Sequence, residues 1–553
     1  MSFRLNKKLV VLVALDGWGI APEGPGNAIS LSQTPNFNRL WNNYPHGQLG
    51  ASGESVGLPR GEDGNSETGH LNLGAGRIVY QYLARINMSI ADGSFFENPV
   101  LIGAARHANE NGSKLHIMGL VGSGGVHSSV EHLYALIKLA AMQKVKKVYV
   151  HAFTDGRDSP PNISETYIKQ ITNVMNKEGV GQIASVTGRY WAMDRDRRWE
   201  RTAKAYFALT KGEGGMFKYP EEAIEQSYAL GATDEFIEPS LIVDEYNKPI
   251  ALVEENDAVI FYNFRIDRPR QLVRAFVMPD AGSVGQEWGF DPYMDKYGLK
   301  QTKGLKPDTP MFKRGERVKN LYFGIMTEYE KPVVEAGAKA AFTPEIVEMP
   351  IGRVISEANL RQIRIAESEK ERFVTYYFNG RREENFSGED RLIVESPKVP
   401  TYDLKPEMSS YEITQKVLKS LDNENYSFAF INYASPDMVG HTGNIAAAKR
   451  AVEAVDECLG KLANQVLNVG GALVITADHG NVEEMINQQT GEIDTEHSVN
   501  TVPLIIVSSQ LISKNINLGL GILADVGPTV LGLLGLQIPS QMNGRNLLKG
   551  ISF

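Results

Sequence analysis

Short, unbroken apolar runs alternate along the chain with polar, glycine-rich stretches. Residues 9–15 form such a run and end at Asp16, and residues 427–433, 472–476 and 502–507 repeat the pattern in the last third. Apolar runs of this length are typical of strands that are buried on both faces of a parallel sheet. The pattern therefore predicts an α/β protein.

The middle of the chain predicts a second α/β unit. Residues 130–143 have the periodicity of an amphipathic helix. Residues 147–153 have the pattern of a strand that follows it, and residues 321–326 are again strand-like. Alternating helix and strand signals favour an α/β arrangement. The polar residues 280–320 predict an excursion on the surface, and the charged residues 379–392 predict a surface loop.

Composition excludes several classes of protein. The 553 residues include 57 basic and 66 acidic side chains, a net charge of −9 without a strongly basic segment, so we expect no nucleic-acid partner. The single cysteine, Cys458, allows no intrachain disulfide and fits a reducing compartment. No run of 18 apolar residues exists, and the first residues lack a signal-peptide pattern. We therefore expect a cytoplasmic protein that does not span a membrane.

A serine within a glycine-rich run, residues 64–70 (Gly-Asn-Ser-Glu-Thr-Gly-His), is the first candidate for chemistry. Glycines let a bulky anion approach the backbone, and a helix that begins here would add partial positive charge. Ser66 could thus become a phosphoserine. The alternative is that Ser66 only caps a helix, since serine is a preferred N-cap residue.

Seven oxygen or imidazole donors are candidate metal ligands, and most of them follow the predicted strands. They are Asp16, Ser66, Asp437, His441, Asp478, His479 and His497. Carboxylates and imidazoles without thiolates suit Mn²⁺ or Zn²⁺ better than Ca²⁺. Two ions with three and four protein ligands would use all seven and could activate a serine hydroxyl. On this argument residues 1–75 and the last third form one domain, whereas taken singly each residue could be a turn, core or surface residue.

The middle part carries a set of residues typical of phosphate binding. They are His127, Arg157, Asp158, Arg189, Arg195, Arg265 and Arg268. Several guanidinium groups at one sheet edge would match a small molecule that carries both phosphate and carboxylate. The alternative for each arginine is an ordinary surface position.

Six separated motifs together resemble one known family. They are Asp16-Gly-Trp-Gly, residues 64–70, Asp155-Gly-Arg-Asp, Gly188-Arg-Tyr with Met193-Asp-Arg-Asp, Asn263-Phe-Arg, and Thr476-Ala-Asp-His-Gly-Asn. In this order they resemble cofactor-independent phosphoglycerate mutase, from about residue 8 to the C-terminus. Residues 524–535 are also similar to the alkaline phosphatase superfamily.

The resemblance implies an alkaline-phosphatase-like three-layer domain with an inserted second α/β domain. The first domain would comprise residues 1–80 and 338–553, and the inserted substrate-binding domain residues 86–332. Residues 77–90 and 330–340 would be hinge linkers that let the domains close on substrate.

The resemblance also implies an isomerase that interconverts 3-phosphoglycerate and 2-phosphoglycerate in glycolysis and gluconeogenesis, through phosphorylated Ser66 and without 2,3-bisphosphoglycerate. Two divalent ions would be bound, Mn²⁺ with Co²⁺ as a substitute, and the protein would be a monomer. The first ion would be held by Asp437, His441 and His497. The second would be held by Asp16, Ser66, Asp478 and His479.

The resemblance further implies substrate-binding roles for the seven phosphate-type residues of the middle part and for Lys370. Asp158 would in addition carry protons during transfer. Two other functions remain open on the sequence: another phosphomutase or phosphomonoesterase of the same superfamily, and a metal-binding protein without catalytic activity.

Overall fold

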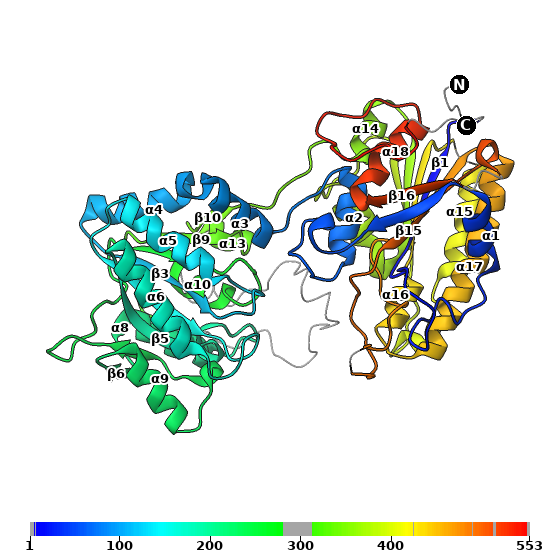
Figure 1. Ribbon diagram of the computed structural model, residues 1–553. Coiled ribbons are helices and arrows are strands. Elements are labelled where there is room, and N and C mark those ends of the chain that lie inside the picture. The colour runs from blue at the N-terminus through cyan, green and yellow to red at the C-terminus, as the bar shows by residue number, and fades with distance from the viewer. Residues whose placement is uncertain are drawn as a thin grey trace. The chain divides into compact units, whose positions relative to one another are not determined.

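The chain divides into two compact units (Figure 1). The computed structural model describes residues 5, 7–279, 312–423, 425–488, 490–512 and 516–549. The discontinuous unit comprises Met1–Gln81 and Glu345–Phe553, and the inserted unit comprises Tyr82–Pro344. Among the described helices, none has the length and apolarity that a membrane span requires.

The discontinuous unit is built on an eight-stranded sheet in the order β12-β11-β13-β1-β14-β15-β2-β16. Neighbouring strands are parallel, except that β15 is antiparallel to both β14 and β2. The strands are β1 (Val10–Leu15), β2 (His46–Gly50), β11 (Gln362–Glu367), β12 (Glu389–Val394), β13 (Phe428–Tyr433), β14 (Ala472–Thr476), β15 (Val502–Ser508) and β16 (Asn517–Ile522).

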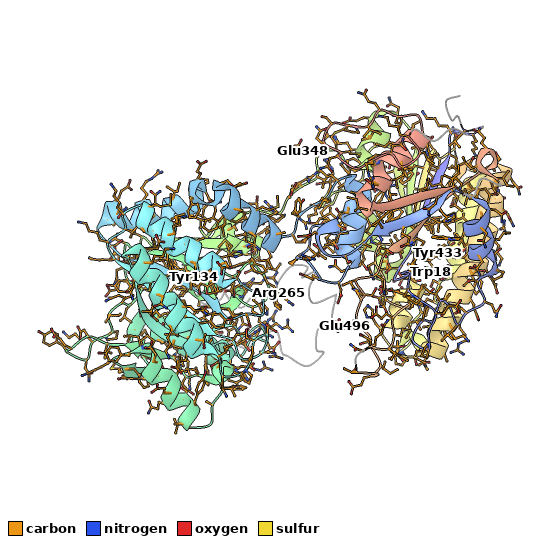
Figure 2. All side chains as sticks on the ribbon, viewed as in Figure 1. Trp18, Tyr134, Arg265, Glu348, Tyr433 and Glu496 are labelled. Carbon is orange, nitrogen blue, oxygen red and sulfur yellow. The ribbon has the colours of Figure 1, made fainter. Side chains whose placement is uncertain are left out.

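The central strands of this sheet are buried because they carry apolar residues on both faces. Every residue of β1, β13 and β14 is buried. In the sheet, Val10 pairs with Phe428 on one side and with Ala472 on the other, so these three strands end at the same edge. Trp18 and Tyr433 belong to the core of this unit (Figure 2).

Helices cover both faces of this sheet and complete the predicted three-layer architecture (Figure 1). One group packs together and against β11, β14 and β15: α1 (Pro35–Asn43), α15 (Ser410–Asn423) and α17 (Ile445–Asn468). The other group packs together and against β1 and β11: α2 (Ser66–Ala75), α14 (Ile351–Glu357) and α18 (Val526–Leu533). The short helix α16 (Ser435–Gly440) follows β13.

The inserted unit has its own eight-stranded sheet, in the order β10-β9-β8-β3-β4-β5-β7-β6. Only β7 is antiparallel to its neighbour β5 among the paired strands that the structure describes. The strands are β3 (Leu115–Val121), β4 (Val148–Thr154), β5 (Gln182–Gly188), β6 (Gly215–Phe217), β7 (Ser240–Ile242), β8 (Ala258–Phe261), β9 (Tyr322–Thr327) and β10 (Lys339–Phe342).

Two apolar clusters flank the sheet of the inserted unit, because successive strand residues point to opposite faces. Ile117 belongs to one cluster and the next residue, Met118, to the other. The first cluster packs under α3 (Tyr82–Asp92), α4 (Pro99–Asn111), α5 (Val130–Met142), α6 (Ser164–Glu178) and α9 (Pro220–Ala229). The second packs under α7 (Arg189–Ala192), α8 (Trp199–Lys211), α10 (Arg270–Val277) and α13 (Lys331–Glu335). The predicted fold class, an α/β domain with an inserted second α/β domain, is confirmed.

The second boundary between the units lies later than predicted. The segment 338–344 belongs to the inserted unit, because β10 pairs in parallel with β9. The expected linker 330–340 is therefore occupied by α13 and the start of β10. At the first boundary, most of the expected linker 77–90 is occupied by α3.

The prediction of a surface loop at 379–392 is wrong in part. Residues 389–394 form the edge strand β12, and both Asn379 and Glu389 are buried. The amide of Asn379 donates to Glu389 at 2.8 Å, and the buried Arg364 lies 3.8 Å from the same carboxylate. The hydrogen bond and the ion pair to Glu389 thus allow its charged side chain to be buried. Of the polar residues 280–320, positions 280–311 lie outside the described residues.

Candidate functional site

The polar cluster of the discontinuous unit lies where its central strands end. Asp16 directly follows β1, Asp437 lies in α16 just after β13, and Asp478 with His479 follows β14. Because β1 is the parallel neighbour of both β13 and β14, their carboxyl ends bring these side chains to one edge of the sheet. All four are buried.

Ser66 is the first residue of α2 and reaches this cluster. Its hydroxyl lies 3.0 Å from His479 Nε2 and accepts a 2.8 Å hydrogen bond from Lys370 Nζ. The helix cap is the neighbouring Asn65, whose side chain accepts from the Thr68 N–H at 2.9 Å. The alternative that Ser66 only caps the helix is therefore wrong, since Asn65 performs that role.

Lys370 lies at the centre of the cluster. Its ammonium also donates to Asp16 and to Asp437, each at 2.8 Å. Burial alone would lower the pKa of Lys370, but the charges of Asp16, Asp437 and Asp478 outweigh burial and raise the pKa above its ordinary value. Lys370 is thus a buried cation that the surrounding carboxylates hold in the charged form.

The pKa values of two carboxylates in the cluster, Asp16 and Asp437, shift in opposite directions. Burial and the charge of Asp478 raise the pKa of Asp16 to about 7, although Lys370 opposes this. Burial would also raise the pKa of Asp437, but Lys370, His441 and His479 hold it well below its usual range. Three buried acids thus share one site that a single ammonium does not fully neutralise.

The arrangement of His441 and His497 fits a metal ion. His441 Nδ1 lies 2.7 Å from the Thr495 carbonyl oxygen, and His497 Nδ1 lies 2.8 Å from the Gly64 carbonyl oxygen. A neutral ring whose Nδ1 donates to a carbonyl has an unprotonated Nε2. These Nε2 atoms lie 3.1 Å apart, and each lies 3.4 Å from Asp437 Oδ1. Three lone pairs that converge in this way are suited to a cation, and the three residues form a group that could hold a metal ion.

The second group of donors also fits a cation. Potential ligand atoms of Asp16, Asp437 and His479 lie within 4.8 Å of one another, and so do those of Asp16, His70 and Asp478, so the predicted second set of ligands is divided between two groups. Neither carboxylate oxygen of Asp478 accepts a hydrogen bond from the described residues, although the rings of His70 and His479 lie 3.2 and 3.4 Å from its Oδ2. Buried carboxylate oxygens without donors are costly unless a cation compensates them.

His70 and Asn432 are residues that the sequence interpretation did not assign. His70 Nδ1 lies 2.9 Å from the Ser66 carbonyl oxygen and 3.2 Å from Asp478, and its Nε2 lies 3.0 Å from the amide of Asn432. The same amide donates to Asp16 at 2.7 Å. His70 also forms, with Asp16 and Asp478, a group that could hold a metal ion, but the Asn432 amide faces its Nε2, an arrangement that suits a residue orienting its neighbours. A polar Asn432 inside an apolar strand was the available signal.

The inserted unit collects its charged residues at the carboxyl ends of the adjacent parallel strands β8, β3, β4 and β5. Arg189, which begins α7 after β5, contacts both Asp155 and Asp158 at 2.5 Å. His127 Nε2 lies 3.5 Å from the Asp158 carboxylate. Burial, with the charge of Arg189 and other arginines, lowers the pKa of His127 to about 3.

Asp267 joins the remaining members of this cluster and was missed in the sequence, although it lies between two predicted arginines. Its buried carboxylate accepts from Arg195 at 2.7 Å and from Arg265 at 3.1 Å. Burial would raise the pKa of Asp267, but Arg265, His127 and Arg195 lower it to about 2. Arg265 marks the place of this cluster in Figure 2.

Two predicted arginines differ in their surroundings. Burial and the charges of Arg189 and Arg195 lower the pKa of Arg268 to about 10, and its Nε has no hydrogen-bond partner among the described residues. Arg157 is more than half exposed and lies 3.4 Å from Glu235. Lys370, predicted to bind substrate with this group, lies in the discontinuous unit beside Ser66.

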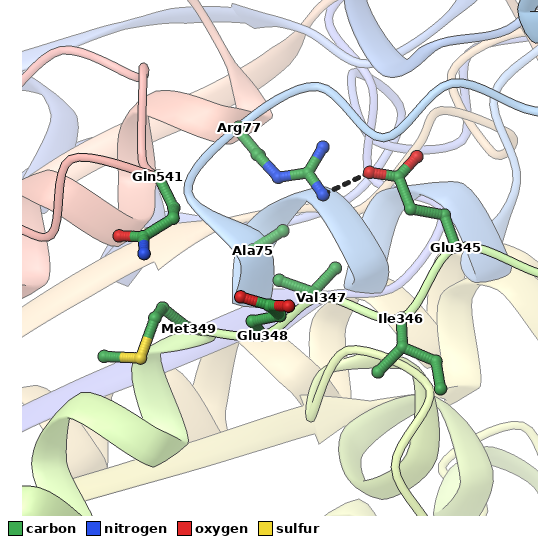
Figure 3. A pocket seen from close by; sticks show the side chains of 8 residues that line it. All are labelled: Ala75, Arg77, Glu345, Ile346, Val347, Glu348, Met349 and Gln541. Carbon is green, nitrogen blue, oxygen red and sulfur yellow. Dashed lines mark hydrogen bonds and ion pairs between the residues drawn. The ribbon is translucent and has the colours of Figure 1, made fainter.

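A separate pocket of about 240 Å³ lies in the discontinuous unit, near the two points at which the chain leaves and re-enters it (Figure 3). Arg77 and Glu345 line the pocket and form an ion pair across it. This ion pair joins two chain segments that are distant in sequence. The residues that line the pocket include neither Ser66 nor the carboxylate cluster.

The fold and the site define a class of α/β proteins that gather carboxylates, imidazoles and one hydroxyl at the end of a largely parallel sheet. Comparisons with known proteins give the family. Residues 86–331 match the family described as BPG-independent PGAM N-terminus, and residues 349–513 match type I phosphodiesterase / nucleotide pyrophosphatase.

Curated relatives match the whole chain. The 2,3-bisphosphoglycerate-independent phosphoglycerate mutase of Moorella thermoacetica is 48% identical over 548 residues, 99% of each chain. The enzyme of the same name from Thermomicrobium roseum is 49% identical over 545 residues, 98% of each chain. Crystal structures of Leishmania mexicana phosphoglycerate mutase at low cobalt concentration include a chain of 30% identity and TM-score 0.59, with 99% of both chains covered.

The chain belongs to the 2,3-bisphosphoglycerate-independent phosphoglycerate mutase family. The resemblance predicted from the six motifs is therefore confirmed, and with it the prediction that the chain is an enzyme.

Proposed function

We propose that this enzyme interconverts 3-phosphoglycerate and 2-phosphoglycerate through a phosphoserine at Ser66, without 2,3-bisphosphoglycerate. The observation that carries the proposal is the position of the Ser66 hydroxyl, between Lys370 Nζ at 2.8 Å and His479 Nε2 at 3.0 Å. The names of the full-length relatives support the substrate.

The donor sets fit two divalent cations, and Mn²⁺ is the proposed ion, with Co²⁺ as a substitute. Asp437, His441 and His497 would hold one, and the other would be held by Asp16, Ser66, Asp478 and His479. Two such cations lower the pKa of a bound hydroxyl and withdraw charge from phosphoryl oxygens.

The residues around Ser66 prepare it for attack on phosphorus. Lys370 stabilises negative charge on the Ser66 oxygen, and the N–H groups at the start of α2 favour an anion there. Ser66 releases its hydroxyl proton to water, and the bond from Ser66 Oγ to phosphorus forms as the bond from phosphorus to the substrate oxygen breaks. The released glycerate oxygen takes up a proton, for which Asp158 is the proposed carrier. In the return step the other glycerate hydroxyl gives its proton to Asp158 and bonds to phosphorus as the bond from phosphorus to Ser66 Oγ breaks, and Ser66 takes a proton back from water.

The arginine cluster of the inserted unit suits the carboxylate and phosphate of the substrate. Guanidinium groups bind such anions through paired hydrogen bonds. We propose that Arg157, Arg189, Arg195, Arg265 and Arg268, together with His127, hold glycerate between the two transfers. This retention separates a mutase from a phosphatase.

The test is conversion of 3-phosphoglycerate by the purified protein with Mn²⁺ and without 2,3-bisphosphoglycerate. Ser66→Ala should abolish turnover, and EDTA should do the same reversibly. Ser52→Ala is the control, because the half-buried Ser52 donates only to the Val499 carbonyl among the contacts described for its side chain. Release of free phosphate and glycerate, in place of 2-phosphoglycerate, would favour a phosphomonoesterase and exclude the mutase.

A further inference from the structure

One buried carboxylate, that of Glu483, contacts three separate segments of the discontinuous unit. Glu483 is only 2% exposed and belongs to neither the carboxylate cluster nor the predicted ligands. Its Oε2 accepts from the backbone N–H groups of Gly19 at 2.9 Å and Asn481 at 2.8 Å. Its Oε1 accepts from the Ser498 hydroxyl through a short bond and from the Asn500 amide at 3.1 Å.

Each of these segments also carries a proposed metal ligand. Gly19 lies in the segment that begins with Asp16, Asn481 closely follows His479, and Ser498 directly follows His497. The side chain of Asn481 extends this network to a fourth segment, since its amide donates to Asp437 at 2.9 Å. One carboxylate therefore sets the relative positions of ligands that are more than 400 residues apart in sequence.

The backbone around Glu483 is shaped to admit this carboxylate. A Cβ atom at Gly19 or at Gly480 would overlap the Glu483 carboxyl group. Glycine at both positions thus lets the backbone approach closely enough for short hydrogen bonds. A buried charge with four donors is a fully satisfied network, and such networks specify one arrangement of their members.

We propose that Glu483 is a positioning residue that holds the ligand-bearing segments of the metal centre in register. The inference rests on the proposed function, because it assumes that Asp16, His479 and His497 bind metal. Residues that orient metal ligands without touching the metal typically contribute about 10- to 100-fold to metal affinity.

Two conservative variants separate positioning from charge. Glu483→Asp keeps the charge but is too short to reach all three segments. Glu483→Gln loses the charge but keeps the reach, because its remaining oxygen can accept both backbone N–H groups. Its amide can then face the Ser498 hydroxyl, which rotates to accept, while Asn500 keeps its 2.8 Å hydrogen bond to Glu484.

The experiment is calorimetric titration of Mn²⁺ into the metal-free full-length protein, with thermal unfolding in EDTA as a measure of the fold. We expect Glu483→Asp to bind Mn²⁺ about 10-fold or more weakly, and Glu483→Gln to bind nearly as tightly as the wild type. Glu484→Asp is the matched control, because the Glu484 carboxylate accepts from the Asn500 amide at 2.8 Å, whereas the N–H groups of Gly19 and Asn481 donate to Glu483. It should bind Mn²⁺ like the wild type.

Three results would overturn the inference. The first is weak binding by Glu483→Gln with normal binding by Glu483→Asp, which would make charge the important property. The second is unchanged affinity in both variants with lowered thermal stability, which would leave a purely structural role. The third is a wild type that binds no Mn²⁺, which would also overturn the proposed metal centre. A wild type that binds Mn²⁺ but fails to isomerise phosphoglycerate would overturn the proposed function alone.

Discussion

The two units handle charge in different ways. In the discontinuous unit, Asp16, Asp437, Asp478 and Lys370 are all buried at the end of the sheet. In the inserted unit, the charged residues also follow the strands, but several remain partly open to solvent: side-chain exposure is 23% for Arg195, 25% for Asp158 and 55% for Arg157.

The sign of the charge differs as well. The buried site has more carboxylates than cations, and its lone pairs converge on a space between donors. The open site has more guanidinium groups than carboxylates, and Asp155, Asp158 and Asp267 hold them in place. A buried acidic site suits cations that stay bound, whereas an open basic site suits an anion that must enter and leave.

The largest expected effect is the removal of the central cation. In Lys370→Met, three buried carboxylates lose their common counterion, so the metal-free protein should lose about 3–5 kcal/mol of unfolding free energy. Urea unfolding in EDTA measures this loss, and Mn²⁺ should reduce the difference from the wild type. The exposed Lys405→Met in the same unit is the control. Equal stability of Lys370→Met and wild type in EDTA would show that the carboxylates do not depend on this ammonium.

The second prediction concerns the basic site. Asp267→Asn removes the shared acceptor of Arg195 and Arg265, and hydrogen bonds to charged groups contribute about 1.5–3 kcal/mol. We expect the KM for 3-phosphoglycerate to rise by about 10-fold or more, with Mn²⁺ affinity unchanged. Asp196→Asn is the control, because Asp196 contacts Arg198 and is about half exposed. Tighter substrate binding by Asp267→Asn would mean that net charge outweighs the orientation of the arginines.

The third prediction uses His132, a buried histidine of the inserted unit. Burial lowers the pKa of His132 to about 3. Unfolding restores an ordinary pKa near 6.5, so below that pH the unfolded state binds a proton that the folded state does not. The contribution of His132 to stability is therefore present above pH 6.5 and is lost as the pH falls, by about 2 kcal/mol between pH 7 and 5.

His132→Gln should remove this part of the acid sensitivity. Urea unfolding in EDTA at pH 7 and pH 5 should show a decrease that is smaller in the variant than in the wild type by about that amount. Gln can still contact Asn87, which lies 2.9 Å from His132 Nε2. Identical decreases in both proteins would mean that His132 accepts a proton in the folded state.

The buried centre of the discontinuous unit could be predicted from the sequence because apolar strands and their polar ends are local signals. β1, β13 and β14 are apolar on both faces, and the residues after them carry donors. Edge strands have no such signal. β12 reads as a charged loop, because its buried Glu389 becomes favourable only when Arg364 and Asn379 contact it.

Contacts that only the fold creates explain why the sequence interpretation missed other residues. Asn65 and Ser66 are both favourable N-cap residues, and only the start of α2 shows that Asn65 is the cap. Asp267 and Glu483 each lie two residues after a recognised motif, but this nearness in sequence does not reveal their contacts. Their roles depend on which arginines and N–H groups the fold brings to them.

The smallest expected effect lies at the pair that joins the two boundary segments, Arg77 and Glu345 (Figure 3). The side chains are 22% and 30% exposed, and a pair so accessible to water contributes about 1 kcal/mol or less. A double-mutant cycle of Arg77→Gln and Glu345→Gln, measured by urea unfolding, should therefore give a coupling below about 1 kcal/mol. Both variants should keep the wild-type affinity for Mn²⁺, because neither residue contacts the carboxylate cluster in the described structure. A coupling of several kcal/mol would show that the two segments connecting to the inserted unit are fixed as firmly as the buried carboxylate cluster. The contrast between strong ion pairs in the interior and a weak ion pair at the boundary would then be wrong.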